Sequence, residues 1–256
     1  MTVPYEYELD TGTGKNVNYT IYAKAFDTSN NNTNSETINI LVCENGTVTD
    51  IDDNVYQTKM FGNQEWMVEN LKVNHYRNGD PIPNATDGST WAALTYGAYC
   101  YYNNNSSNSE TYGALYNWYA VEDSRGLAPE GWHVPTDDEI KELEMYLGLS
   151  ESQANSEGWR GTNEGSKLAG SHDLWTNGAM RNDPEFGSSG FDLIPGGFRN
   201  YYSGSFYSMG YSGRFWSSTE NNKHPAWYRD VDYDYTTVYR YGFIKCGGFS
   251  VRCVKD

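Results

Sequence analysis

Residues 198–256 place apolar and small side chains at a few separated points and fill the intervals almost entirely with Tyr, Asn, Asp, Ser and His. The apolar and small points are 215–218, 226–227 and 248–254. This mixture makes a poor hydrophobic core, because buried polar groups need hydrogen-bond partners. It makes a good contact surface, since Tyr combines a large rigid face with a hydroxyl group and Ser, Asn and Asp supply adaptable hydrogen bonds. The segment predicts a ligand-facing surface on a rigid scaffold, with a solvated, Tyr-rich sheet as the alternative.

The composition narrows the class of protein and of partner. At 256 residues the chain is long enough for two domains. Only 38% of the residues are hydrophobic while 16% are aromatic, so we expect a core built from rings more than from aliphatic chains. The formal charge of -16 opposes binding to nucleic-acid phosphates or to an anionic membrane. No run approaches the roughly 20 apolar residues that span a bilayer, so we expect neither a nucleic-acid partner nor membrane insertion.

The first residues show no targeting signal, whereas the cysteines favour an oxidising compartment. No basic patch or apolar stretch of a signal peptide is visible, so we expect a processed chain or a piece of a longer one. The cysteines Cys43, Cys100, Cys246 and Cys253 are widely spaced and form no CxxC motif or Cys/His cluster. One or two disulfides are therefore a simpler interpretation than a zinc site.

Residues 1–43 show the period-two alternation of antiparallel strands. Alternating runs at 5–9, 17–26 and 37–42 surround a polar, turn-forming loop at 27–35. Three strands are too few for a sandwich of about seven and expose unpaired edges. The pattern YTIYAKAFD, a loop and TINILV resembles the closing strands of a bacterial immunoglobulin-like domain. Self-assembly by strand addition to a neighbouring subunit is the hypothesis that follows.

Residues 47–58 allow two interpretations. Asp50, Asp52 and Asn54 have the alternate oxygen ligands of a calcium loop, but the sixth position lacks Gly and the twelfth lacks Glu. A β-hairpin with an Asp-Asn turn explains the same residues and is the favoured interpretation. A further strand pair is predicted around residues 62–67.

The clearest local signal is a helix that begins after Thr136. Thr136 and Glu139 form a capping box, and Gly148 stands where a left-handed cap belongs. The predicted apolar face consists of Ile140, Leu143 and Leu147. A second capping box, Ser150 with Gln153, predicts a short helix after it.

Three aromatic or histidine signals are interpreted structurally. The spacing of Leu115, Trp118 and Tyr119 predicts a short amphipathic helix within 112–121. His133 has no nucleophile or metal ligand beside it, so a core or helix-approach histidine is favoured over a catalytic base. Trp159 and Trp175, in loop-rich segments, are interpreted as buried side chains that pack beneath the loops.

Six motifs in order resemble the Fibrobacter succinogenes major paralogous domain family. They are TVTDIDDNVY (47–56), EWMVENL (65–71), YGALYNWYAV (112–121), GWHVP (131–135), FWSST (215–219) and GFSVRC (248–253). The resemblance implies an α+β, C-type-lectin-like domain over 44–256, with short antiparallel sheets, few helices and long loops, related to formylglycine-generating-enzyme domains. It also implies an exported bacterial protein, extracellular or on the cell surface. Some members serve as variable proteins of diversity-generating retroelements, and residues 200–241 have the texture of such a variable region.

The chain departs from the family pattern at two cysteines. Many members carry Cys where this chain has Glu65 and Ala128, as the loss of one disulfide would leave it. The resemblance then favours a bridge between Cys100 and Cys253, with the pairing of Cys43 and Cys246 left open. The calcium-ligating motifs of sugar-binding C-type lectins are not found, so calcium-dependent sugar recognition by that route is not expected.

The first functional hypothesis is a non-enzymatic module that binds a protein or glycan outside the cell, without cofactor or metal. In this reading Asp230, Asp232 and Asp234 share one strand face and mutually repel, so they need solvent, a cation or a basic partner. The candidate ligand contacts are Tyr201, Tyr202, Tyr207, Tyr211, Arg214, Asn221, Asn222, His224, Tyr228, Asp230, Asp232, Tyr233, Asp234, Tyr235, Tyr239 and Tyr241.

Two other hypotheses belong to different classes. In one hypothesis, the chain is a structural subunit of a surface fibre or adhesin, assembled through its first strands. Alternatively it is an oxidase of the formylglycine-generating type, whose reactive cysteine pair lies near the C-terminus, as Cys246 and Cys253 do. The oxidase hypothesis is disfavoured, because Cys253 matches a framework position and no base or metal cluster accompanies either thiol.

Overall fold

The computed structural model describes residues 17–21, 24–26, 32–34, 38–42, 46–221 and 225–256. The chain divides into two compact units, residues 1–45 and 46–256. In the first unit, β1 (Val17–Ile21) pairs antiparallel with β4 (Ile38–Val42), and β2 (Lys24–Phe26) pairs with β3 (Asn32–Asn34). The strands β1, β2 and β4 lie in runs predicted as strands, whereas β3 lies in the predicted loop. The run at 5–9 lies outside the described residues.

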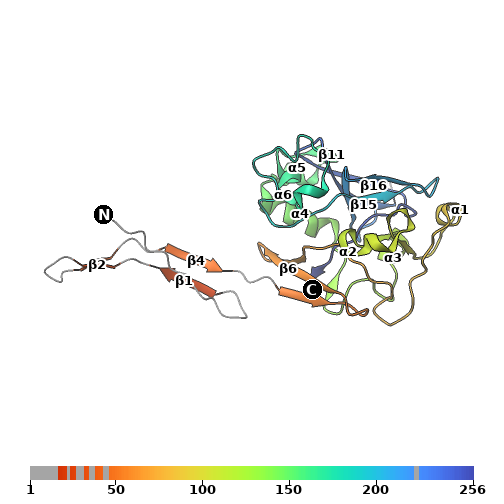
Figure 1. Cartoon of the computed structure of the whole chain (residues 1–256), viewed down its shortest axis with the longest axis horizontal. Coiled ribbons are helices and arrows are strands. Elements are labelled where there is room, and N and C mark those ends of the chain that lie inside the picture. Colours follow the sequence, from red (N-terminus) through yellow and green to blue (C-terminus); the bar gives the residue numbers. More distant parts are fainter. Residues whose placement is uncertain (1–16, 22–23, 27–31, 35–37, 43–45, 222–224) are drawn as a thin grey trace. The chain divides into compact units, whose positions relative to one another are not determined.

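Residues 46–256 contain two main sheets and a few short helices, which confirms the α+β class (Figure 1). One sheet has the strand order β10-β17-β7-β6-β5, and the other has the order β11-β16-β15-β14-β12-β13. The first comprises β5 (Gly46–Thr49), β6 (Val55–Phe61), β7 (Gln64–Met67), β10 (Trp132–His133) and β17 (Val254–Lys255). The second comprises β11 (Gly158–Arg160), β12 (Gly196–Arg199), β13 (Phe206–Met209), β14 (Ser212–Trp216), β15 (Ala226–Asp232) and β16 (Val238–Phe243).

The remaining elements are short. The α-helices are α1 (Gly88–Ala92), α2 (Ser109–Tyr112), α3 (Trp118–Val121), α4 (Asp137–Leu147), α5 (Glu151–Asn155) and α6 (Glu164–Leu168). The strands β8 (Tyr99–Cys100) and β9 (Leu115–Tyr116) form a small pair. The 3-10 turns are η1 (Tyr102–Asn104), η2 (Ser106–Asn108) and η3 (His172–Leu174). None of the helices in the described part of the chain has the length and apolar character that crossing a membrane requires.

The helix after Thr136 forms as the sequence predicts. The Thr136 side chain accepts from the Glu139 N–H, the Glu139 carboxylate accepts from the Thr136 N–H, and α4 ends at Gly148 with φ 130°. The predicted apolar face is buried. The second capping box, Ser150 with Gln153, is also present and begins α5. Both helix starts are local signals, which explains why sequence alone found them.

The single helix predicted within 112–121 is wrong. Gly113, with φ 72°, ends α2, and the next residues form β9 against β8. A new helix, α3, begins only after Asn117, whose side chain accepts from the Ala120 N–H. Leu115 thus lies in a strand, because the left-handed backbone at Gly113 interrupts the helical path.

The six-stranded sheet separates two buried cores. Alternation along β15 places Tyr228 on the face that packs in the cluster with Trp216 and Phe249. Val231 lies on the opposite face, in the cluster with Ile140 and Leu143 of α4. Rings are prominent in the cluster with Tyr228, but aliphatic side chains outnumber rings in the cluster with Val231, so, contrary to the prediction, the core as a whole is not built mainly from rings.

Buried ion pairs tie α4 to this sheet. The Arg229 guanidinium donates to Asp137 at 2.9 Å and to Glu144 at 2.7 Å. Arg240, from the neighbouring strand, donates to the other oxygen of Asp137 at 2.6 Å. Because all of these groups are buried, each charge depends on its partner for solvation. The helix therefore fixes the strands that carry the predicted contact residues.

Candidate functional site

The sheet register brings four residues from distant parts of the chain into one row. Trp159 of β11 lies opposite Tyr239 of β16. Tyr239 lies opposite Asp230 of β15, which in turn lies opposite Arg214 of β14. Residues opposite one another on neighbouring strands point to the same face, so the row crosses four strands on one side of the sheet. Three of the four are predicted contacts, and Trp159 is new.

The row continues onto β12 and β13. The Arg214 guanidinium carbon lies 3.9 Å from the ring centroid of Phe198, and Phe198 lies opposite Tyr207. The rings of Phe198 and Tyr207 stack with centroids 5.7 Å apart. One face of the six-stranded sheet thus carries aromatic rings at both ends with an arginine and an aspartate between them.

The turn that joins β15 to β16 carries the exposed end of this row. The Tyr235 N–H donates to the backbone oxygen of Asp232, and the Asp234 N–H donates to the Asp232 carboxylate at 3.1 Å. Tyr235 stacks on Trp159 with centroids 4.2 Å apart and an interplanar angle of 11°. Tyr235 is 48% exposed and Trp159 is 38% exposed, so the stack faces solvent. We name Trp159, Asp232, Asp234, Tyr235 and Tyr239 the hairpin-tip surface.

The charges in the row are unevenly compensated. The Asp230 carboxylate is buried, accepts from Arg214 Nε at 2.8 Å and accepts from Ser212 Oγ at 2.6 Å. In the described part of the chain Asp232 forms no such ion pair. Partial burial of Asp232 raises its pKa, and the charge of Asp230 raises it further, whereas the Asp234 N–H and the charge of Arg214 only partly offset these effects. The exposed part of the surface is therefore acidic.

Two predicted contacts do not reach solvent. Tyr228 and Asp230 are each only 5% exposed. The Tyr228 ring packs against Phe249 with centroids 4.9 Å apart, and burial raises the pKa of its hydroxyl. Both residues point into the sheet face where it is covered, so they support the surface rather than present it.

The predicted row of three carboxylates along one strand is also wrong. The strand β15 ends at Asp232, and Asp234 lies in the turn beyond it. The hydrogen bond from the Tyr235 N–H closes the turn and takes Asp234 out of the strand alternation. Only Asp230 and Asp232 keep the predicted spacing.

The other predicted contacts lie in several places. Tyr202 is 83% exposed in the turn between β12 and β13, and Tyr201 packs edge-on against Phe243. Tyr211 precedes β14 and contacts Tyr233 edge-on, with centroids 5.2 Å apart. Tyr241 and Asn221 are partly buried, and Asn222 and His224 lie outside the described residues.

Sequence reasoning misassigned Trp159 as a buried side chain, whereas Trp175 is buried as predicted. Trp159 stands in the stretch EGWRGTNEG, which has no other large apolar residue. An isolated tryptophan in polar surroundings favours an exposed position, and this signal would have found it.

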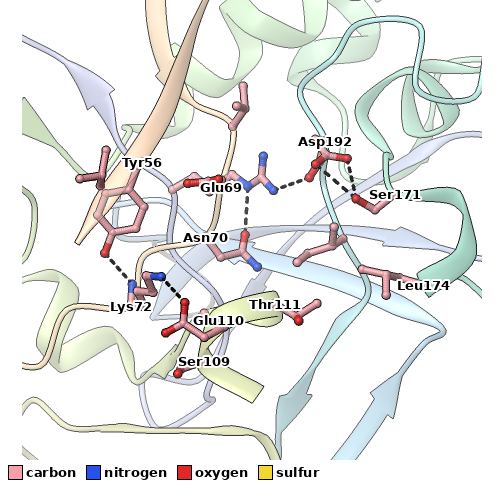
Figure 2. A pocket seen from close by; sticks show the side chains of 15 residues that line it. Tyr56, Glu69, Asn70, Lys72, Ser109, Glu110, Thr111, Ser171, Leu174 and Asp192 are labelled. Carbon is pink, nitrogen blue, oxygen red and sulfur yellow. Dashed lines mark hydrogen bonds and ion pairs between the residues drawn. The ribbon is translucent and has the colours of Figure 1, made fainter. Parts of the chain in front are cut away.

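A polar pocket of about 310 Å³ was also missed, and Figure 2 shows it. Arg252 is fully buried beside it and donates to Asn70 Oδ1 at 3.0 Å, to the Asp192 backbone oxygen at 2.6 Å and to the Phe191 backbone oxygen. Burial lowers the pKa of Arg252 to about 10, although the charges of Asp192 and Glu69 act in the opposite direction.

The rim of this pocket contains two unusual backbone positions. Ser171 has φ 52° and Asp192 has φ 53°, and the Ser171 hydroxyl donates to the Asp192 carboxylate at 3.1 Å. On another part of the rim, Lys72 pairs with Glu110 at 2.9 Å. Together with the contacts of Arg252, these interactions tie five chain segments together, so we assign the pocket a structural role. An arginine between apolar residues in GFSVRC was the available signal for a buried, paired cation.

The hairpin interpretation of residues 47–58 is confirmed, because β5 and β6 pair antiparallel around the turn at 50–54. Asp50 accepts from the backbone N–H groups of Asp52 and Asn54 and from the Tyr56 hydroxyl. Asp52 accepts from the N–H groups of Asn74 and His75 and contacts the His75 ring. The two aspartates of the weak calcium candidate therefore use their carboxylate oxygens for contacts within the protein. Among the described residues, no group of three or more His, Cys, Asp or Glu side chains could hold a metal ion.

The predicted disulfide is not formed. Cys100, Cys246 and Cys253 are free thiols, and Cys43 lies outside the described residues. Cys100 packs with Trp91 and Leu94, whereas Cys253 packs in the separate cluster around Tyr56 and Trp132. The two thiols therefore have different surroundings. Cys246 donates to the Leu94 oxygen at 3.1 Å.

Comparison with known proteins identifies the family. No curated protein and no solved structure gave a significant match to the chain. The model of the Fibrobacter succinogenes major domain matches residues 60–255, which is more than half of the 256 residues. This range includes both main sheets except β5 and the first residues of β6. The chain therefore belongs to the Fibrobacter succinogenes major domain family.

Proposed function

We propose that this chain is a non-enzymatic module that binds a protein or glycan ligand outside the bacterial cell. The hairpin-tip surface is the centre of the contact, and the row through Arg214, Phe198 and Tyr207 extends it. The observation that carries the proposal is the solvent-facing stack of Trp159 on Tyr235. Large exposed aromatic rings beside adaptable polar groups are typical of binding surfaces.

The scaffold under the surface supports this role. The buried pairs from Asp137 and Glu144 to Arg229 and Arg240 hold the central strands against α4. A surface that is rigid before binding loses less conformational entropy when the ligand arrives. We further propose the finer fold, a C-type-lectin-like domain preceded by immunoglobulin-like strands, on the basis of two short-stranded sheets, few helices and long irregular segments.

A binding survey tests the proposed function. The purified chain would be applied to arrays of bacterial and host glycans and of extracellular proteins, beside a variant with Trp159→Ala and Tyr235→Ala. We expect a signal for the native chain that the double variant loses. Tyr146→Ala is the matched control, because this tyrosine is 60% exposed but lies on α4. Ligand capture that the double variant retains in full would contradict the proposal.

Diversification of this surface is part of the proposal. Tyr202, Tyr207, Tyr211, Asp234 and Tyr235 are exposed within residues 200–241, so substitutions there would change the surface with little effect on the core. Sequencing the genomic locus tests it. We expect a reverse-transcriptase gene and a near-duplicate of the final coding segment, and a locus that lacks both would contradict this part.

The first unit favours a second candidate function, a subunit of a surface fibre. Within the described residues, β1 and β4 form a two-stranded sheet, so each has one edge without a strand partner. Such edges accept strands from another chain. Electron microscopy of the purified protein tests this candidate, because long polymers would support it and monodisperse single particles would contradict it.

A further inference from the structure

The hairpin-tip surface offers negative charge without a compensating cation of its own. Asp234 is exposed, Asp232 is partly exposed, and both lie in or beside the turn that carries Tyr235. Arg214, the basic residue of the same row, is paired with Asp230, and its charge offsets that of Asp232 only in part. The chain as a whole carries a formal charge of -16. An anionic ligand would therefore be repelled from this surface, and a cationic one attracted.

The aromatic part of the surface favours the same kind of ligand. The rings of Trp159, Tyr235 and Tyr239 form a contiguous group. The centroid of the Trp159 ring lies 5.0 Å from that of Tyr239 and 4.2 Å from that of Tyr235. Aromatic faces attract cations, tryptophan most strongly, and such contacts involve arginine more often than lysine. A guanidinium or ammonium group placed on the ring of Tyr235 would also lie beside the turn that carries Asp232 and Asp234.

We propose that the hairpin-tip surface binds basic side chains, arginine or lysine, presented by a protein partner. This inference rests on the proposed function and names the ligand chemistry of the same site. The exposed rings supply a flat contact for the guanidinium or for the aliphatic stem, and Asp232 and Asp234 supply the opposite charge. Neutral glycans would use the rings but gain nothing from the two charges.

A pair of synthetic peptides tests the inference on the full chain. The probe is a blocked, fluorescently labelled peptide of alternating arginine and glycine, and the control peptide has citrulline, the neutral analogue, in place of each arginine. Fluorescence anisotropy measures both affinities. We expect the arginine peptide to bind at least about tenfold more tightly, since cation–π and ionic contacts act together. The difference should shrink at about 1 M salt, where the Debye length is about 3 Å.

Variants separate a specific contact from general attraction to an acidic protein. Trp159→Ala and Asp234→Asn should each weaken arginine-peptide binding by about fivefold, as expected for the loss of a cation–π or charge contact. Glu130→Gln is the matched control for charge, because it removes one exposed carboxylate in the loop before β10. Trp159→Phe keeps an aromatic face and should retain most of the affinity, and circular dichroism checks the fold of each variant.

The outcomes distinguish this inference from the proposed function. Equal affinity for the two peptides, no measurable binding of either, or equal effects of Asp234→Asn and Glu130→Gln would overturn the inference. If the arrays at the same time show a neutral glycan or an uncharged protein surface whose capture needs Trp159 and Tyr235, the proposed function stands with another ligand class. If the native chain captures nothing on the arrays and binds neither peptide, both the inference and the proposed function are overturned.

Discussion

The indole of Trp159 lies parallel to the phenol of Tyr235, at a centroid distance of 4.2 Å, although 75 residues separate them along the chain. The contact exists because β11 is the edge strand that pairs with β16, so its central residue meets the turn before β16. The stack is exposed, whereas Tyr228 of the neighbouring strand lies in the core. Two tyrosines seven residues apart thus have opposite roles.

This difference predicts that replacing each of the two tyrosines by alanine lowers the free energy of unfolding by unequal amounts. Tyr235→Ala removes a half-exposed ring and should lower the free energy of unfolding by about 0.5–1.5 kcal/mol. Tyr228→Ala removes a ring from the core cluster and should cost about 3–5 kcal/mol. Urea denaturation of the full chain, followed through the unfolding of residues 46–256, measures the free energy of unfolding of both variants. Equal losses for the two variants would contradict the assignment of Tyr235 to a surface and Tyr228 to the scaffold.

The buried ion pairs of α4 predict a large effect of one carboxylate. Asp137→Asn removes the carboxylate that pairs with Arg240 and one of the two that pair with Arg229, and should cost about 3–5 kcal/mol. Asp138→Asn is the matched control, because this neighbouring carboxylate is exposed and pairs with Lys141 at the surface. Urea denaturation should show a change below about 1 kcal/mol for this control. Similar losses for the two variants would contradict the role of the buried cluster.

The same carboxylate predicts acid sensitivity. Burial alone would raise the pKa of Asp137, but the hydrogen bonds and charges of Arg240 and Arg229 outweigh it and hold the pKa below its usual value. A lowered pKa in the folded state gives stability that is present above about pH 4 and is lost as the pH falls further. The stability difference between the native chain and Asp137→Asn should therefore shrink in strong acid. A difference that grows with acidification would contradict this.

His133 predicts a dependence on pH in the opposite direction. Partial burial lowers the pKa of His133, but hydrogen bonds to Asp256 at 2.7 Å and to Glu139 at 2.8 Å outweigh it, and the net shift is upward. A raised pKa gives stability that is full below about pH 6.5 and is lost as the pH rises through the folded-state value. His133→Gln should thus be less stable than the native chain at about pH 6 and nearly equal at high pH. Thermal unfolding across this range measures it, and a constant difference would contradict it.

Local patterns explain most of what the sequence predicted. The capping boxes at Thr136 and Ser150 and the turn at Asp50 involve residues within a few positions of one another, so one sequence is enough to find them. The family motifs identified the family, whose model matches residues 60–255. Within residues 198–256, the mixture of Tyr and short polar residues predicted a surface, and most of the candidate contacts in the described residues are at least partly exposed.

Long-range register explains most of what the sequence missed. Trp159 joins the surface only because β11 pairs with β16, and a strand of three residues carries little information about its partner. Tyr228 and Asp234 were misassigned because strand alternation does not reveal where a strand ends or which part of a face is covered. The resemblance to families with disulfides likewise could not place Cys100 and Cys253 in separate clusters.

The cysteines predict a defined order of reactivity. Burial raises the pKa of the Cys100 thiol to about 12 and raises that of Cys253 as well, so both should resist alkylation in the folded state. Among the three cysteines that the structure describes, Cys246 is only partly buried and should react first. Mass spectrometry after iodoacetamide treatment, with and without urea, measures this order. Detection of a peptide linked through Cys100 and Cys253 without reductant would contradict the free thiols and restore the predicted bridge.

Asp232 predicts opposite effects on stability and on binding. Its pKa is raised mainly by partial burial and then by the charge of Asp230, so its ionisation at neutral pH disfavours the folded state. Asp232→Asn keeps an oxygen that can accept from the Asp234 N–H and removes the charge. We therefore expect a higher melting temperature than that of the native chain at pH 7, with the gain disappearing below about pH 4, where the native carboxylate is also neutral. The same variant should bind the arginine peptide more weakly, because a surface kept for binding tolerates a charge that the fold alone would not. A variant that is less stable at neutral pH, or that binds the peptide unchanged, would show that this carboxylate serves the fold rather than the ligand.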